Sequence, residues 1–160
     1  MLLQPGITGF LGYKDKLPTI DLKSFKACCY AIAIAVEGRV LEFQPADYGK
    51  NFHHALLEVD APISHILVLL NLVYPLIAFA DPISCNYCHL EFMDVPSLSK
   101  QFDRTKSGYE YKVLSKQELE TPFNSVDEKL LTSILLAAEI SQIRHWQPQR
   151  VGEIVFNFWD

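Results

Sequence analysis

Basic residues are missing from the middle of this chain. No Lys or Arg occurs between residues 51 and 99, and the fourteen that the chain carries are scattered elsewhere. A nucleic-acid binder needs clustered Lys and Arg to displace counterions along the phosphates. The sequence therefore argues against nucleic acid, while its net charge of −5 is compatible with a basic protein partner.

The chain also lacks an uninterrupted hydrophobic run. Its longest apolar stretch, residues 63–80, contains His65, Asn71 and Pro75, and no basic residue anchors either end. The first basic residue is Lys14, so no charged segment precedes an apolar export signal. We expect a soluble, cytoplasmic protein without membrane contact.

Common cofactor and catalytic motifs are absent from the sequence. There is no P-loop, G-x-G-x-x-G, G-x-S-x-G or H-E-x-x-H pattern. An acid/base group of His53, Glu58 and Asp60 is conceivable, but solvated side chains after strands explain these residues better. The sequence thus implies no cofactor and favours a protein that is not an enzyme.

The composition is that of a folded protein, with 49% hydrophobic and 21% charged residues among 160. This length suits one domain over residues 1–160. The order of the expected elements predicts an α+β or α/β fold, with a mixed sheet of about four to six strands and three or four helices.

Hydrophobic periodicity places most of these elements. Asp21 is a helix cap, and apolar residues at helical spacing follow it as far as Val36. Composition and alternation predict strands at residues 39–44, 52–60 and 109–114, and a short strand at 7–11. Pro75 divides the long apolar stretch, and the apolar run after it predicts a buried strand at 76–80. A short helix is expected after Ser97, and residues 63–72 fit a helix or a strand equally well.

The C-terminal third predicts a long helix followed by a final strand. Residues 125–128, with the sequence SVDE, form a capping box that starts a helix, and Pro148 ends it. Ile154, Phe156 and Phe158 then alternate as one face of a strand.

The stretch CNYCH, residues 85–89, is the strongest chemical signal. Covalent haem would use both cysteines and His89, but that attachment belongs to exported chains. A zinc site would take Cys85, Cys88 and His89 as ligands, and no second ligand pair supplies the fourth. A redox dithiol of Cys85 and Cys88 is the third possibility.

Residues 75–92 resemble the active-site segment of the thioredoxin-like family, in which a buried strand leads to a C-x-x-C that opens a helix. The resemblance implies that Cys85 is the nucleophile and Cys88 the resolving thiol. It also implies a cis-proline beside them, for which Pro122 is the candidate. Ser84 replaces the aromatic residue frequent before the first cysteine, and the predicted C-terminal order differs from that family.

The hypothesis that the whole chain favours is a soluble protein-interaction module, such as an inhibitor, antitoxin-like or immunity-like protein, with an unidentified protein partner. Trp146 and Trp159, in the aromatic C-terminal part, are the candidate binding residues. The apolar content is also compatible with a homodimer. The thiol oxidoreductase or sensor is the alternative, and a structural zinc site ranks third.

Overall fold

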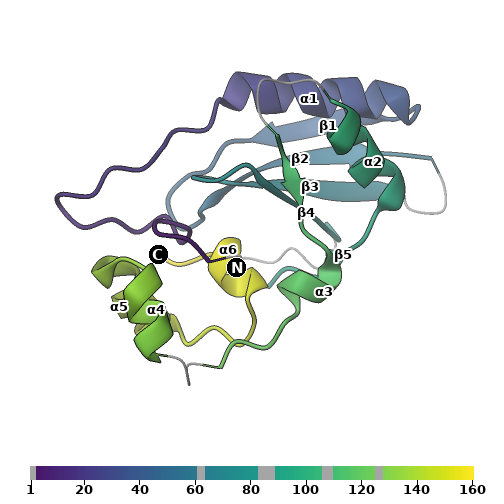
Figure 1. Cartoon of the computed structure of the whole chain (residues 1–160). Helices are drawn as coiled ribbons and strands as arrows, with labels where there is room; N and C mark the ends of the chain where they lie inside the picture. The colour runs from purple at the N-terminus through teal and green to yellow at the C-terminus, as the bar shows by residue number, and fades with distance from the viewer. Residues whose placement is uncertain (1–2, 61–63, 83–88, 106–109, 125–127) are drawn as a thin grey trace.

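One sheet crosses the molecule between two layers of helices (Figure 1). The computed structural model describes residues 3–60, 64–82, 89–105, 110–124 and 128–160. The strands are β1 (Arg39–Gln44), β2 (Phe52–Glu58), β3 (His65–Asn71), β4 (Leu76–Ala80), β5 (Phe92–Met93) and β6 (Lys112–Val113). The helices are α1 (Leu22–Ala35), α2 (Pro96–Arg104), α3 (Lys116–Leu119), α4 (Glu128–Ile134), α5 (Ala137–Trp146) and α6 (Gly152–Val155).

Strands β1 to β4 form an antiparallel meander in chain order. The outer edge of β4 pairs with two short strands, β5 antiparallel near one end and β6 parallel near the other. The predicted α+β class, the mixed sheet and its strand number are therefore confirmed. The described residues hold six helices, more than the three or four expected.

Residues 63–72, whose periodicity fitted a helix or a strand, contain the strand β3. Ile66, Val68 and Leu70 pack in the core cluster beneath α1 and α2. Leu67 and Leu69 face the opposite cluster, which the chain ends and the C-terminal helices cover. A strand buried on both faces reads as a continuous apolar run, so its sequence hides the two-residue period.

Helix α1 begins where the sequence predicts and ends in a Schellman motif. The Asp21 carboxylate accepts a hydrogen bond from the Lys23 amide as N-cap. At the other end, the amide of Gly38 donates to the Ala33 carbonyl and that of Glu37 to Ile34. Glu37 has a φ of 57°, a left-handed position that glycine usually occupies.

The expected strand at residues 7–11 is wrong. The chain makes tight turns there, because Gly6 and Gly9 have φ values of 86° and 82°. Ile7 is fully buried among core residues. The apolar residue therefore indicated burial correctly, although the segment is not a strand. The strand at 109–114 is shorter than predicted, and Tyr109 lies outside the described residues.

The single long C-terminal helix is also wrong, because Leu136 interrupts it with an extended backbone between α4 and α5. Glu139 is fully buried, and it accepts hydrogen bonds from the amides of Leu136, Gly6 and Thr8 and from the Thr8 hydroxyl. A straight helix would leave these N-terminal donors without this acceptor. The capping box expected at Ser125 lies outside the described residues.

The final strand is replaced by α6 and an irregular buried tail. Three buried asparagine side chains satisfy the backbone there. Both Asn51 and Asn71 donate to the carbonyls of Ile7 and Val155, at 2.6–3.1 Å. The Asn157 amide donates to the side-chain oxygen of Asn51 at 2.7 Å. Asparagine side chains thus satisfy the backbone groups of these two segments, which neighbouring strands would satisfy in a sheet.

Replacing Asn71 by Ala should lower the free energy of unfolding by about 3 kcal/mol. The amides of Val73 and Tyr74 lose their acceptor, and a buried donor without a partner costs about 1–3 kcal/mol. Urea unfolding followed by circular dichroism measures this, with the exposed Asn124→Ala as control. Equal midpoints for the two variants would contradict a structural role for the asparagines.

Candidate functional site

The segment after α5 forms the wall of a pocket of about 490 Å³. It turns at Gln147, which has a φ of 49°, and returns along α6 toward the C-terminal tail. Apolar and aromatic side chains dominate the lining, together with one arginine. The lining residues are Leu90, Phe92, Trp146, Gln147, Pro148, Gln149, Arg150, Glu153, Phe156, Asn157, Phe158 and Trp159.

Arg150 fixes this pocket to the sheet. Its guanidinium is largely buried, is paired with the carboxylates of Glu120 and Glu153, and donates to the Leu90 carbonyl at 2.6 Å. It also lies over the Phe92 ring, 5.1 Å from the centroid. A buried cation needs such compensation, so Arg150 acts mainly as a support for the loop.

Arg150 also brings together two residues that the sequence singled out, His89 and Pro122. Its Nη2 lies 3.3 Å from His89 Nδ1, and its backbone forms a bridge with Pro122. A guanidinium can only donate, so His89 Nδ1 is the acceptor in this contact. A metal ion at that nitrogen would lie beside a fixed positive charge.

Cys85 and Cys88 lie outside the described residues. The described residues after them do not continue the helix that the thioredoxin resemblance implies: His89 to Glu91 form no helix, and Phe92 begins β5, which pairs with β4. Within the described ranges, no group of three or more His, Cys, Asp or Glu side chains is arranged to hold a metal ion.

The two candidate tryptophans line the same pocket but differ in exposure. Trp159 is 9% exposed and belongs to the core, with the Phe10 ring 6.3 Å away. Trp146 is 39% exposed, and its indole nitrogen donates to Gln142 at 3.1 Å. Trp146 is thus the side chain that solvent or a partner can reach.

A second pocket of about 610 Å³ lies on the other side of Trp159. Phe10 and Tyr48 line it, and Tyr48 is fully exposed. We call the surface formed by Trp146, Phe158, Trp159, Phe10 and Tyr48 the aromatic face. Sequence reasoning missed Phe10, Tyr48 and Arg150, because only the folded chain brings these separate segments together.

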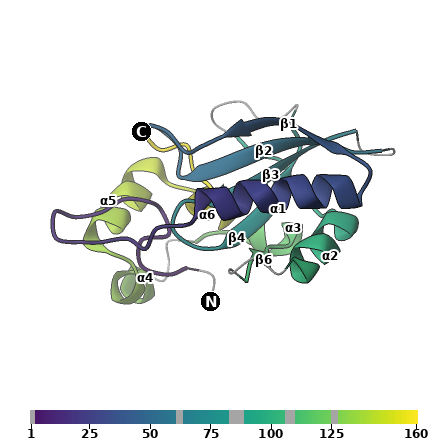
Figure 2. The same ribbon diagram turned by 90° about the horizontal axis from the view of Figure 1, so that it is seen from above.

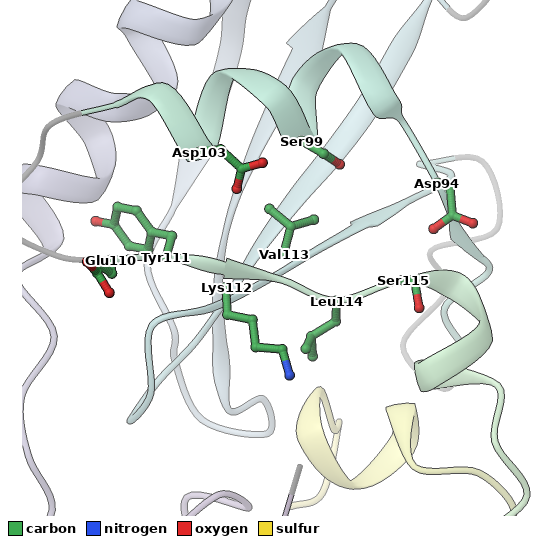
Figure 3. A pocket seen from close by; sticks show the side chains of 9 residues that line it. All are labelled: Asp94, Ser99, Asp103, Glu110, Tyr111, Lys112, Val113, Leu114 and Ser115. Atoms are coloured by element: carbon green, nitrogen blue, oxygen red, sulfur yellow. The ribbon is translucent and has the colours of Figure 1, made fainter. Parts of the chain in front are cut away.

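A third pocket, of about 430 Å³, lies between α2 and residues 110–115 (Figure 3). The carboxylates of Asp94, Asp103 and Glu110 line it. Figure 3 shows Asp103 directed into the gap and Lys112 pointing to the opposite side of β6, where it lies 3.6 Å from Glu118. This acidic pocket favours a positively charged group, and its residues do not form a catalytic arrangement.

The conceivable acid/base group is not assembled. His53 Nδ1 accepts a hydrogen bond from the Ala46 amide at 2.8 Å, while Glu58 pairs with Arg39 at the other end of β2. Burial, and secondarily the charge of Lys50, lower the pKa of His53. The imidazole is therefore a neutral structural acceptor.

Comparisons with known proteins assign no family: the chain matches no family model, no curated protein and no solved structure. Among the helices that the structure describes, none has the length and apolar character needed to cross a bilayer.

The lowered pKa of His53 predicts a loss of stability in acid. Above its ordinary pKa of 6.5 the imidazole is neutral in both states. As the pH falls below that value, the imidazole is protonated in the unfolded chain before it is protonated in the folded protein. The free energy of unfolding therefore decreases until the pH has passed the lower pKa of the folded state. Urea midpoints measured from pH 7.5 to 5 should fall, and fall less in His53→Gln, whose amide can still accept. An identical decline of the urea midpoint in both proteins would show that His53 does not cause the loss of stability in acid.

Proposed function

We propose that this protein is a non-enzymatic interaction module of the inhibitor, antitoxin or immunity type, and that it binds its protein partner through the aromatic face. The observation that carries the proposal is the exposed Trp146 beside an apolar pocket whose floor Arg150 holds rigid. Tryptophan and arginine are enriched among the residues that dominate binding energy at protein interfaces.

The aromatic face has the properties of a preformed binding surface. Its loop is fixed by the ion pairs of Arg150 and by the Asn157 side chain, which accepts from the Trp159 amide. A loop held in its bound conformation loses little entropy on association. An apolar side chain of a partner would gain contacts with Trp146 and Phe158 without displacing core residues.

Charge would contribute mainly to the rate and specificity of binding. The chain has a net charge of −5, and three carboxylates line the acidic pocket beside α2. Such a distribution steers a basic partner and disfavours acidic ones. We therefore infer a partner with a basic surface and an apolar side chain that enters the pocket.

Trp146→Ala should weaken binding of the partner by at least about 30-fold, the loss typical of a residue that contributes about 2 kcal/mol. The partner is first captured from the native cell extract by immobilised wild-type protein and identified by mass spectrometry. Its affinity is then measured with purified proteins by calorimetry. Leu41→Ala, an apolar truncation of similar exposure on the edge strand β1, is the matched control.

Equal affinity of the Trp146 and control variants for a purified partner would show that binding uses another surface. Turnover of a substrate by the purified chain alone would contradict the non-enzymatic part of the proposal. Glu153→Gln offers a further check, because it weakens the support of Arg150 without changing the apolar lining. Its effect should be smaller than that of Trp146→Ala.

A thiol oxidoreductase or thiol sensor built on Cys85 and Cys88 is the second proposal. The contacts of Arg150 with both His89 and Pro122 support it, since they bring the proline candidate near the end of the C-x-x-C-H stretch. Against it stands the extended chain after His89, where a redox dithiol of the thioredoxin type would open a helix.

Thiol labelling of the native protein should leave Cys28 and Cys29 unmodified. Both are buried on the inner side of α1, and burial raises the pKa of each thiol. Labelling across pH with mass mapping therefore reports on Cys85 and Cys88 alone. A fast-reacting Cys85 with a pKa below that of an ordinary thiol would favour the redox proposal, and silence of all four until denaturation would remove it.

A further inference from the structure

The outer face of α1 is apolar although it faces solvent. From Ala27 to Ala35 the helix has no charged residue. Figure 2 views this helix from its outer side, with the sheet behind it. Ile34 is 77% exposed and Tyr30 47% exposed. A helix that is hydrophobic on all sides is normally buried. The fold of one chain therefore leaves an apolar helix face without a packing partner.

Five exposed residues of α1 and its C-terminal end lie on one stripe, with Lys26, Ala31 and Ala35 exposed beside it. Lys23, Ala27, Tyr30 and Ile34 are separated by four, three and four residues, and Glu37 follows three residues later. All five are exposed. This is the spacing of a single helical stripe that contacts another helix. The stripe carries a positive charge at its start, apolar residues in the middle and a negative charge at its end.

Both charges oppose the dipole of their own helix. Lys23 lies in the first turn, where the helix dipole is positive, and Glu37 follows the last turn, where it is negative. Glu37 also occupies the left-handed position of the Schellman motif, at a conformational cost that glycine avoids. Within the described residues Glu37 forms no ion pair. Lys23 has one favourable contact in the monomer, because its charge, after the hydrogen bond from Ser24, helps to lower the pKa of the N-cap carboxylate of Asp21. The charge of Glu37 is not explained by the stability of α1.

We propose that a second copy of this chain docks on the outer face of α1, with the two helices antiparallel about a two-fold axis near Tyr30. In this arrangement Lys23 lies opposite the second copy's Glu37, and Ala27 lies opposite the second copy's Ile34. The two-fold repeats each pair, so one surface complements itself. The antiparallel dipoles then attract, and each misplaced charge gains an opposite neighbour.

The sizes of the side chains fit close packing of the two helices. Ala27 and Ala31 leave room for the larger Ile34 of the facing helix, which allows the axes to approach to about 8 Å. Lys26 does not interfere, because its ammonium lies over the Phe43 ring, 5.4 Å from the centroid. The contact from Lys23 to Ile34 is roughly 16 Å long.

The expected dimer is weak and reversible. One helix pair of this length buries less than the area of about 800 Å² per partner found in stable complexes. The stripe lies over the face of the sheet opposite to the C-terminal helices, so dimerisation leaves the aromatic face accessible (Figure 1). This inference is independent of the proposed function and needs no other protein for its test.

Sedimentation velocity of the purified full chain over a wide range of concentrations tests the proposal. The wild-type protein should pass from monomer to dimer with micromolar affinity. Ile34→Glu should raise the dimer dissociation constant about 30-fold or more, since the two-fold places the change in the interface twice. Leu130→Glu is the matched control, because Leu130 is an exposed leucine on α4, away from α1, and it should leave the dimer unchanged.

Charge reversal gives a second test that misfolding cannot mimic. Lys23→Glu and Glu37→Lys each place like charges opposite one another, and each should weaken the dimer about tenfold. Both charges agree with the helix dipole, and Glu37→Lys should leave the folded monomer at least as stable as the wild type. Lys23→Glu also places a carboxylate near Asp21, so the urea midpoint of this variant is measured beside its dimer dissociation constant. The double variant restores opposite charges across the interface and should recover the wild-type dissociation constant.

A wild-type protein that stays monomeric at the highest attainable concentration would overturn the proposal. A dimer that Ile34→Glu leaves intact would also overturn it, because the contact would then lie elsewhere. Failure of the double variant to recover dimerisation would exclude the antiparallel register. Cross-linking of Tyr30→Cys by a short bismaleimide, mapped by mass spectrometry, should join position 30 of both copies, and a link at other sites only would contradict the two-fold axis.

Discussion

The pairing of buried asparagine amides with the two ends of the chain is the constraint on which the rest of this structure depends. The described residues before α1 and after α5 form no strand that could satisfy their backbone groups, yet both segments are packed into the core. Asn51 and Asn71 bind a carbonyl from each segment at the same time. Because a buried carbonyl without a donor is costly, this arrangement fixes how the ends meet the sheet. The segment after α5 that lines the first pocket is therefore held in place by these hydrogen bonds.

Glu139 shows how one polar residue can change the course of the backbone. Its carboxylate serves both the amide that begins α5 and the turn at Thr8, more than a hundred residues away in sequence. The interruption between α4 and α5 lets one side chain satisfy donors from both places. Arg150 has a comparable role in the segment after α5. Its guanidinium pairs with two carboxylates and donates a hydrogen bond to a backbone carbonyl. The conformation of both segments thus relies on two buried polar residues, Glu139 and Arg150.

The sequence predicted the regular elements well and the irregular ones poorly. Asp21 and the apolar spacing after it located α1, strand-like patterns located β1 and β2, and the apolar run after Pro75 located β4, because these signals are local. The helix interruption at Leu136 and the buried tail after Val155 depend on hydrogen bonds to distant residues, which no local pattern reveals. For the site, the sequence selected Trp146 and Trp159 by residue type. It missed Tyr48, Phe10 and Arg150, which join them only through tertiary packing. Cys85 and Cys88 remain sequence-based candidates.

The asparagine network also has a consequence for how the protein acquires its structure during synthesis. The meander of β1 to β4 contains mostly neighbouring pairings and can form while the nascent chain is still growing. Asn157 and Thr8, which are joined by a hydrogen bond, are 149 residues apart, so that bond cannot form until the segment after α6 has been synthesised. Until then, the sheet face that the chain ends cover is open, with Leu67 and Leu69 exposed to other proteins in the cell. The unfinished chain is therefore the species that most needs a chaperone.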